Sequence, residues 1–168
     1  MRARELNETN RRGATVAIDG LKVRDVDALA AALAPLPLLQ KYGTTATSLA
    51  GALVRAVEGG DMVLSARLAG EPVGVAWVVG DGAFARAAYL RLMAVVPAVH
   101  GQGVGAELLR EVEVRLADSS SHLLLLASDF NTAAHAFYRR LGYEQVGIIP
   151  GFVLPTVDEW IFAKRLVG

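Results

Sequence analysis

Apolar residues recur along this chain in two periods, one typical of helices and one typical of strands. Where they repeat at intervals of three and four residues, they form one face of an α-helix. The clearest example is AELLREVEVRLADS, residues 106–119, in which charged residues occupy the other faces. The pattern predicts helices over residues 26–34, from 44 or 45 to 58, over 106–119 and over 131–141.

Capping and stop signals place the ends of the first two helices. Asp25 is the expected N-cap of the first one, and Pro35 and Pro37 end it because proline cannot continue a helix. Gly59-Gly60 follows the second helix, where glycine accepts the left-handed backbone of a helix end. The segment Leu38–Tyr42 is then predicted to be a plain connection between the two helices.

The remaining apolar runs are short and bounded by turn residues, as β-strands are. Two of them flank Ala69-Gly70-Glu71 as an antiparallel hairpin, and the run 122–127 is apolar throughout, as in a strand covered on both faces. Strands are expected over residues 14–22, 62–68, 72–80, 86–96, 122–127, 143–149 and 157–166. This order predicts an α/β fold with a mixed, mostly antiparallel central sheet flanked by helices.

Chain length favours one compact domain. A chain of 168 residues is long enough for one core and too short for two independent ones. We therefore expect a single domain over residues 14–168, preceded by a mobile polar arm, residues 1–13.

Charge and composition exclude several classes of partner. Lysine plus arginine and aspartate plus glutamate number 17 each, so there is no net positive charge to attract nucleic acid or anionic membranes. No apolar stretch reaches the ~20 residues that span a bilayer. The N-terminal segment also lacks the apolar core of a secretory signal. Because the chain has no cysteine, we expect a cytoplasmic protein without disulfides or thiolate metal sites.

The segment that points most directly to a ligand is the glycine-rich loop HGQGVG, residues 100–105, between an expected strand and an expected helix. Its glycines let a ligand approach the backbone, and a helix N-terminus favours an anion such as phosphate. A Walker loop would need Lys and Ser or Thr where Ala106 and Glu107 stand. The spacing also differs from the G-x-G-x-x-G of dinucleotide-binding folds. By themselves, the glycines are equally compatible with a simple turn.

Two motifs together carry a resemblance to a known family. The segments LMAVVP, HGQGVG and AELL, within residues 92–109, resemble the acyl-CoA pyrophosphate loop of the GNAT superfamily of N-acetyltransferases, Arg/Gln-x-x-Gly-x-Gly/Ala. NTAAHAFYRRLGYEQVG, residues 131–147, resembles the Asn-x-x-Ala-x-x-x-Tyr-x-x-x-Gly-Phe/Tyr helix of that superfamily. The resemblance covers residues 61–166. It implies the acyl-CoA N-acyltransferase fold, splayed where its fourth and fifth strands run parallel, and transfer of acetyl from acetyl-CoA to a primary amine without a metal.

The resemblance also implies roles for individual residues. A backbone amide near Val95 would polarise the acyl carbonyl, and the amides from Gln102 to Ala106 would hold the pyrophosphate. Asn131 would contact the pantetheine arm, and Tyr138, the implied catalytic residue, would protonate the departing thiolate. The implied cofactor-binding residues are Met93, Ala94, Val95, His100, Gly101, Gln102, Gly103, Val104, Gly105, Ala106, Asn131 and Tyr138.

The chain departs from the family pattern in the loop and at the general base. His100 stands where arginine or glutamine usually opens the loop, although backbone amides hold most of the pyrophosphate. Leu90 and Leu126 stand where many relatives carry a glutamate that serves as general base. Other residues are left as candidates for that role, directly or through water: Asp129, His135, Glu144, Asp158 and Glu159. A desolvated pocket that lowers the pKa of the amine is an alternative to a dedicated base.

The sequence does not identify the acceptor. Residues 38–42 and 152–155 correspond to connections that border the acceptor site in many relatives. The missing glutamates also fit a non-catalytic sensor that binds acyl-CoA, and the same motifs fit transfer of another acyl group or transfer to oxygen. These alternatives stay open, as does the oligomeric state, although homodimers are common in the resembling family.

Overall fold

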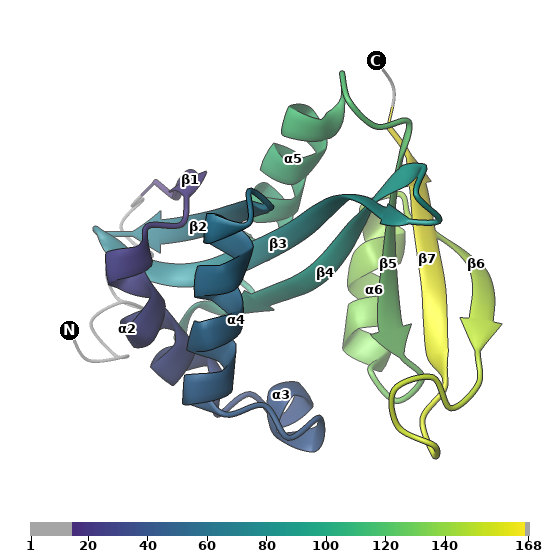
Figure 1. Ribbon diagram of the computed structural model, residues 1–168, viewed down its shortest axis with the longest axis horizontal. Helices are drawn as coiled ribbons and strands as arrows, with labels where there is room; N and C mark the ends of the chain where they lie inside the picture. The colour runs from purple at the N-terminus through teal and green to yellow at the C-terminus, as the bar shows by residue number, and fades with distance from the viewer. Residues whose placement is uncertain (1–14, 167–168) are drawn as a thin grey trace. The chain divides into compact units, whose positions relative to one another are not determined.

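The computed structural model describes residues 15–166 and contains a seven-stranded sheet with helices (Figure 1). The predicted N-terminal arm, residues 1–13, lies outside the described residues. The helices are α2 (Val23–Leu33), α3 (Pro37–Lys41), α4 (Ala46–Glu58), α5 (Val104–Leu116) and α6 (Thr132–Arg140), and a 3-10 turn covers Pro97–Val99. The strands are β1 (Ala17–Gly20), β2 (Met62–Leu68), β3 (Glu71–Ala83), β4 (Ala87–Val95), β5 (His122–Ser128), β6 (Glu144–Ile149) and β7 (Glu159–Arg165). None of the described helices is both long and apolar enough to cross a bilayer.

The strands are hydrogen-bonded in the order β1-β2-β3-β4-β5-β7-β6. β4 and β5 are parallel, with Ala88–Leu90 in register with Leu123–Leu125. The pairs β1 with β2, β5 with β7 and β6 with β7 are antiparallel. The predicted fold class, a mixed and mostly antiparallel sheet flanked by helices, is therefore confirmed.

Two predictions about the first helices are wrong. α2 begins at Val23, so Asp25 is not its N-cap, and the Asp25 side chain instead forms an ion pair with Arg67 of β2. The segment predicted to be a plain connection contains α3, which begins at Pro37. Proline suits the first helical turn because the N–H that it lacks would have no intrahelical acceptor there.

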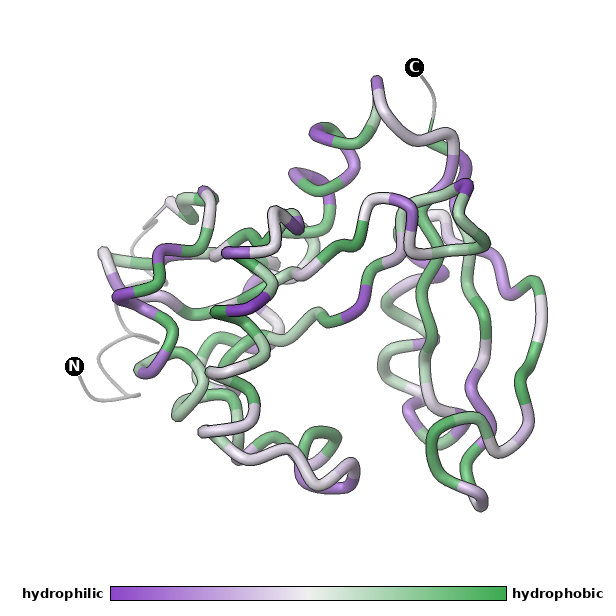
Figure 2. The backbone as a smooth tube through the Cα atoms, viewed as in Figure 1, coloured by the Kyte–Doolittle hydropathy of each residue, from purple (hydrophilic) through white to green (hydrophobic). Residues whose placement is uncertain are grey.

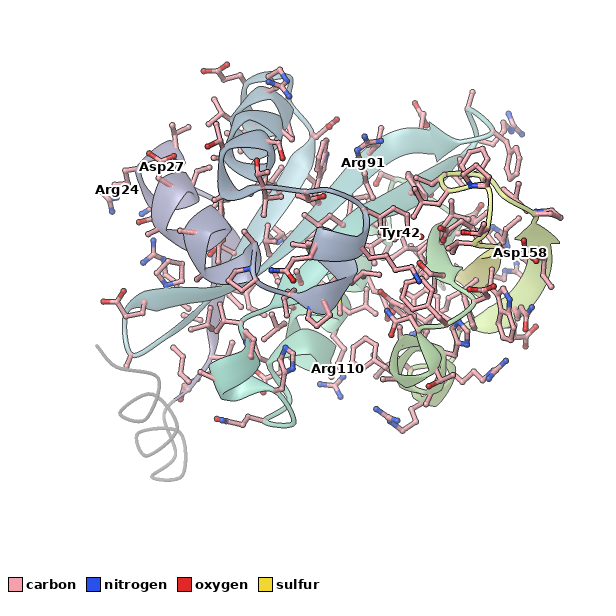
Figure 3. All side chains as sticks on the ribbon, turned by 90° about the horizontal axis from the view of Figure 1, so that it is seen from below. Arg24, Asp27, Tyr42, Arg91, Arg110 and Asp158 are labelled. Atoms are coloured by element: carbon pink, nitrogen blue, oxygen red, sulfur yellow. The ribbon has the colours of Figure 1, made fainter. Side chains whose placement is uncertain are left out.

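The residue contacts divide the chain into two compact units. The described part of the first unit comprises residues 15–77 and 92–112, and that of the second comprises residues 78–91 and 113–166. In the first unit, α2 and α4 lie side by side on one face of the strands, and α5 lies on the opposite face (Figures 1 and 3). Leu29, Leu53 and Leu108 on these three helices are fully buried. α4 begins with a capping box in which Thr45 and Ser48 each accept the backbone N–H of the other.

In the second unit, α6 packs on one face of β5 and β7. Alternate residues of a strand point to opposite faces. Leu125 and Phe162 are paired and buried on the α6 side, whereas Leu126 and Ile161 are paired on the other side and partly exposed.

Figure 2 shows that β5 and the connection between β6 and β7 are largely hydrophobic. This second, partly exposed face is called the Tyr89 face below, because Tyr89 of β4 is in register with Leu124 on it.

Candidate functional site

The predicted anion loop connects the end of β4 to the start of α5. After the 3-10 turn, the backbone reverses at Gly101 and Gly103, whose φ values are 75° and 84°. Residues with a side chain rarely adopt this left-handed conformation, so both positions favour glycine. A Cβ at either glycine would meet no atom within 4 Å, and both residues are exposed. The outer side of the turn therefore has room for a ligand.

The first turn of α5 presents backbone N–H groups. The N–H of Glu107 donates to the carbonyl oxygen of Gly103 at 3.0 Å, so the helix itself supplies no acceptor for the amides of Val104, Gly105 and Ala106. Val104 is 1% exposed and anchors the turn, while Gly105 and Ala106 are partly exposed. With the positive end of the helix dipole, these amides form a site suited to a phosphate group.

His100 and Gln102 brace the turn with their side chains. Nε2 of His100 lies 2.6 Å from the carbonyl oxygen of Val95, and because a carbonyl only accepts, Nε2 carries the proton and donates. Nε2 of Gln102 donates to the carbonyl oxygen of Ala98 at 3.2 Å. The histidine that stands in place of the usual arginine or glutamine thus holds the loop to the end of β4. Its contact with a bound pyrophosphate stays a prediction.

The β4 residues expected along the thioester immediately precede this turn. Met93 and Val95 are partly exposed, while Ala94, which alternates with them, is buried. The next residue, Val96, donates its N–H to the carbonyl oxygen of Val73 at 2.9 Å and holds the strand end in place. Met93–Val95 and the turn thus form one continuous segment, and their contact with an acyl group stays a prediction.

Asn131 begins α6. Its Oδ1 accepts the N–H of Ala134 at 3.2 Å, which makes it the N-cap of the helix. A cap of this kind contributes about 1 kcal/mol to stability. Asn131 therefore has a structural role that the motif did not reveal, and contact with a pantetheine arm is a further role that stays a prediction.

Tyr138, two turns further along α6, is 8% exposed and lies within a group of aromatic rings. The ring centroids of Phe137, Tyr143 and Phe162 lie 5.2, 5.7 and 6.0 Å from its own. Burial raises the pKa of the Tyr138 hydroxyl well above its ordinary value of 10.0. The phenol therefore carries its proton at neutral pH, as required of a group that protonates a leaving thiolate.

Three of the candidate bases make contacts that stabilise the second unit. His135 is 3% exposed, stacks on Trp160 with ring centroids 4.1 Å apart, and donates from Nε2 to the carbonyl oxygen of Ser128 at 3.0 Å. The N–H of Asp129 donates to the carbonyl oxygen of Asp158 at 2.9 Å, and the N–H of Asp158 donates to Oδ2 of Asp129 at 3.4 Å. Figure 3 labels Asp158 in the segment that leads into β7. These contacts favour structural roles for all three residues.

The other two candidate bases differ in burial. Glu144 is exposed at the start of β6, whereas Glu159, at the start of β7, is 4% exposed. Glu159 alternates with Ile161 and so belongs to the Tyr89 face. The pKa of the Tyr89 hydroxyl is raised mainly by burial and further by Glu159, while Arg91 lowers it. Glu159 is thus a buried carboxylate on this face, and a role as general base stays a prediction.

The Tyr89 face also holds a cavity of about 410 Å³ that the sequence did not predict. Leu124, Leu126 and Ile161 line it from β5 and β7, and Arg91 lines it from β4. Phe152 lines it from the connection between β6 and β7, a segment that the sequence associated with the acceptor. Tyr89 and Arg91 alternate along β4, as Leu124 and Leu126 do along β5. These alternations indicate such a face only when the pairing of β4 with β5 is already known.

Comparison with protein families decides the identity of the chain. The family model described as an acetyltransferase (GNAT) domain matches residues 59–145, just over half of the 168 residues. The chain belongs to the GNAT acetyltransferase family. The matched part of this GNAT protein includes the glycine turn, Asn131 and Tyr138, so the resemblance stated from the two motifs is confirmed.

Solved structures share the fold of this GNAT protein. Ard1 from Thermoplasma volcanium is 17% identical with a TM-score of 0.76, over 91% of this chain and 99% of that one. The ribosomal-protein-S18-alanine N-acetyltransferase from Escherichia coli is 22% identical with a TM-score of 0.70, over 92% and 96%. An aminoglycoside 6'-N-acetyltransferase complexed with coenzyme A is 16% identical with a TM-score of 0.72, over 90% and 98%. The names of the Escherichia coli enzyme and of the aminoglycoside enzyme state different acceptors. The shared fold therefore leaves the acceptor of this GNAT protein undetermined.

We expect the GNAT protein to lose stability as the pH rises above 10, because the buried Tyr138 and Tyr143 resist ionisation. Both are protonated below that pH in the folded and the unfolded chain. Above it, only the unfolded chain releases the protons, so the free energy of unfolding falls, by up to ~1.4 kcal/mol per pH unit for each tyrosine. Denaturant unfolding at several pH values measures this slope, and Tyr138→Phe should reduce it. If Tyr138→Phe leaves the slope unchanged, a raised pKa of Tyr138 does not contribute to the loss of stability.

Proposed function

We propose that this protein is a coenzyme A-dependent N-acetyltransferase that transfers an acetyl group from acetyl-CoA directly to a primary amine. The observation that carries the proposal is the glycine turn. Gly101 and Gly103 leave its outer side open, and the helix supplies no acceptor for the amides that follow. Membership of the GNAT acetyltransferase family supports an acyl-CoA as the occupant.

The residues of this turn suit a pyrophosphate. Amides from Gly103 to Ala106 would donate to its oxygens, and the α5 dipole would favour its negative charge. The backbone N–H of Gln102, expected from the sequence to join them, donates instead to the carbonyl oxygen of Val99 at 3.4 Å. His100 would keep the loop attached to β4 through Val95, as the hydrogen bond at 2.6 Å indicates. Bound in this way, the cosubstrate supplies an activated acetyl thioester, and the protein positions and polarises it.

The transfer needs one bond formed and one broken. The nitrogen of the acceptor attacks the acetyl carbonyl carbon, a C–N bond forms, and the C–S bond of the thioester breaks. A backbone amide near Val95 would stabilise the negative charge that develops on the carbonyl oxygen. Tyr138, which burial keeps protonated, would donate its proton to the departing sulfur.

The acceptor must lose a proton before or during its attack. Leu90 and Leu126 leave no acid at the positions where many relatives carry one. The cavity on the Tyr89 face is lined largely by apolar side chains, and such surroundings lower the pKa of an amine by disfavouring its charged form. We infer that desolvation lowers the pKa of the acceptor amine, while Glu159, the buried carboxylate on the same face, stays the candidate for a dedicated base.

Leu90 and Leu126 also favour a second candidate, a sensor that binds acyl-CoA without transferring it. Both candidates predict binding of acetyl-CoA, and they differ in turnover. Calorimetric titration with acetyl-CoA comes first, followed by a panel of amines assayed for release of free CoA thiol. Binding with turnover supports the transferase, and binding without turnover on any amine supports the sensor. Absence of acetyl-CoA binding would overturn both.

A further inference from the structure

The cavity on the Tyr89 face has an apolar lining that is incompletely covered. The lining residues that the structure describes all belong to the second unit. Leu124 is in register with Tyr89, and Leu126 with Ile161. All four side chains are partly exposed although they lie within strands of the sheet. Because apolar surface gains free energy when it leaves water, this lining favours a ligand with an apolar group. A volume of about 410 Å³ is the size of a small-molecule site.

Two charged residues of opposite sign belong to this face. Arg91 lines the cavity, and Glu159 is a buried carboxylate on the same face. Both residues already interact with other residues of the protein. The lining therefore selects a ligand by its apolar group, and the charge of the ligand is varied in the experiment.

Phe84 lies at the tip of the hairpin between β3 and β4, in a backbone conformation that is unfavourable for its side chain. The N–H of Arg86 donates to the carbonyl oxygen of Ala83 at 3.1 Å and closes a two-residue turn. The two residues of this turn, Phe84 and Ala85, have φ values of 55° and 52°, in the left-handed region. Turns with two such residues strongly prefer asparagine and glycine. The hairpin is therefore strained at a position where asparagine would relieve the strain.

The ring of Phe84 does not compensate for this strain through packing. It is 82% exposed although it lines the cavity. A side chain that folding hardly removes from water contributes little apolar stabilisation. Strained residues persist chiefly at ligand sites and switches. An exposed ring in a strained turn beside an apolar cavity thus indicates contact with a ligand.

Phe152 is a second exposed ring of this lining, and hydrogen bonds hold its segment in place. It is 59% exposed and lines the cavity from the connection between β6 and β7. The N–H of Gly151 donates to Oδ1 of Asp158 at 3.1 Å, and the N–H of Asp158 donates to Oδ2 of Asp129 at 3.4 Å. Because the backbone beside the ring is fixed before any ligand arrives, less order is lost when a ligand packs against it.

We propose that the cavity on the Tyr89 face is a binding site for a small molecule with a large apolar group, which Phe84 and Phe152 contact. Binding removes both rings and the strand side chains from water, and this burial stabilises the complex. Two sources share this chemistry, an apolar acceptor amine and an apolar regulator that is not acetylated. The inference concerns binding within the second unit and does not depend on the proposed function.

The first test compares three probes that differ in ring or in charge. Phenethylamine and ethylamine carry the same amine, and only phenethylamine has a ring, while phenethyl alcohol keeps the ring without the charge. Titrations followed by the NMR shifts of the backbone amides measure each Kd. Both ring compounds should bind about tenfold or more tightly than ethylamine, because a phenyl group leaves water. The largest shifts should fall on the lining segments of β5 and β7.

The second test separates ligand contact from stability at the hairpin tip. Phe84→Asn should raise the Kd for phenethylamine roughly two- to tenfold, because an aromatic contact is lost. It should also raise the Tm by roughly 2–4 °C, because asparagine tolerates the left-handed backbone. Ala85→Gly is the matched control, since it relieves the same kind of strain at an exposed neighbour outside the described lining. It should raise the Tm and leave the Kd unchanged.

Phe152→Ala and Val153→Ala form a second matched pair. Val153 is 54% exposed and adjacent in sequence, and it is not among the described lining residues. Phe152→Ala should raise the Kd for phenethylamine roughly two- to tenfold, and Val153→Ala should leave it unchanged. Because both side chains are exposed, both variants should fold normally. Equal effects within this pair, or within the hairpin pair, would overturn the inference.

The last measurement identifies the source of the ligand. The protein is incubated with acetyl-CoA and phenethylamine, and mass spectrometry detects the acetylated amine. Acetylation that Phe152→Ala slows assigns the cavity to the acceptor, whereas bound phenethylamine that stays unacetylated assigns it to a regulator. The NMR titrations need no acetyl-CoA, so they test the site even if the proposed function fails. Absence of binding by both ring compounds contradicts the inference and leaves the proposed function standing.

Discussion

Gly103→Glu is expected to abolish binding of acetyl-CoA in a calorimetric titration. The outer side of the turn at Gly103 is open, and a Cβ there would meet no atom within 4 Å, so the new side chain would occupy the space assigned to the pyrophosphate. Its carboxylate would also repel the phosphate groups at short range. The φ of 84° adds a strain of about 1 kcal/mol, which is small beside the stability of a typical domain.

Gly70→Glu is the matched control for this variant. Gly70 lies in the turn between β2 and β3, has the same φ of 84°, and also has no atom within 4 Å of a built Cβ. The two substitutions therefore add the same charge, the same bulk and a similar backbone strain. Acetyl-CoA should bind to Gly70→Glu as it does to the unchanged protein. If both variants bind equally well, the pyrophosphate is not held at the α5 turn.

A large fall in kcat is expected for Tyr138→Phe. Phenylalanine keeps the ring that packs against Phe137, Tyr143 and Phe162, and removes only the hydroxyl. Loss of a general acid lowers rates by roughly 10²–10⁴-fold. We expect kcat for the best amine of the panel to fall within that range, while calorimetry shows unchanged binding of acetyl-CoA.

Tyr143→Phe separates catalysis from packing. The Tyr143 hydroxyl donates to Oε1 of Glu113 at 2.8 Å, and Oε2 of the same carboxylate accepts from Nζ of Lys164 at 2.7 Å. Because the acceptor is a carboxylate, removing this hydroxyl should lower the free energy of unfolding by about 1.5–3 kcal/mol and leave kcat unchanged. If Tyr138→Phe and Tyr143→Phe lower kcat to the same small extent, Tyr138 is a packing residue and the acid is another group or water.

Local signals predicted most of the secondary structure. The apolar repeat that includes Leu108 and Val112 identified α5, and Gly59 correctly marked the end of α4. Of the two candidate starts of α4, Thr44 and Thr45, the structure has Thr45 as the N-cap. Asp25 was misassigned because an aspartate before an apolar repeat has the composition of an N-cap. Its actual partner, Arg67, is 42 residues away in the sequence, and no local pattern reveals such a pair.

Candidate site residues that belong to continuous motifs were predictable, and those that depend on strand pairing were not. The glycine turn and the helix with Asn131 and Tyr138 each lie within one short segment, so the resemblance to the two family motifs was enough to select them as candidates. The cavity on the Tyr89 face combines residues of β4, β5 and β7 whose side chains converge only through sheet register. Arg91 therefore received no role from the sequence, although it lines that cavity.

The position of β7 between β5 and β6 has a consequence for the folding of the nascent chain. β6 is synthesised before β7, yet its pairing partner in the sheet is β7 and not β5. Until residues 159–165 have left the ribosome, the edges of β5 and β6 that pair with β7 keep unpaired backbone N–H and C=O groups. Incomplete strands of this kind are prone to intermolecular pairing. A pause in translation before β7 would therefore expose this half of the sheet to aggregation, whereas a pause before β5 would not.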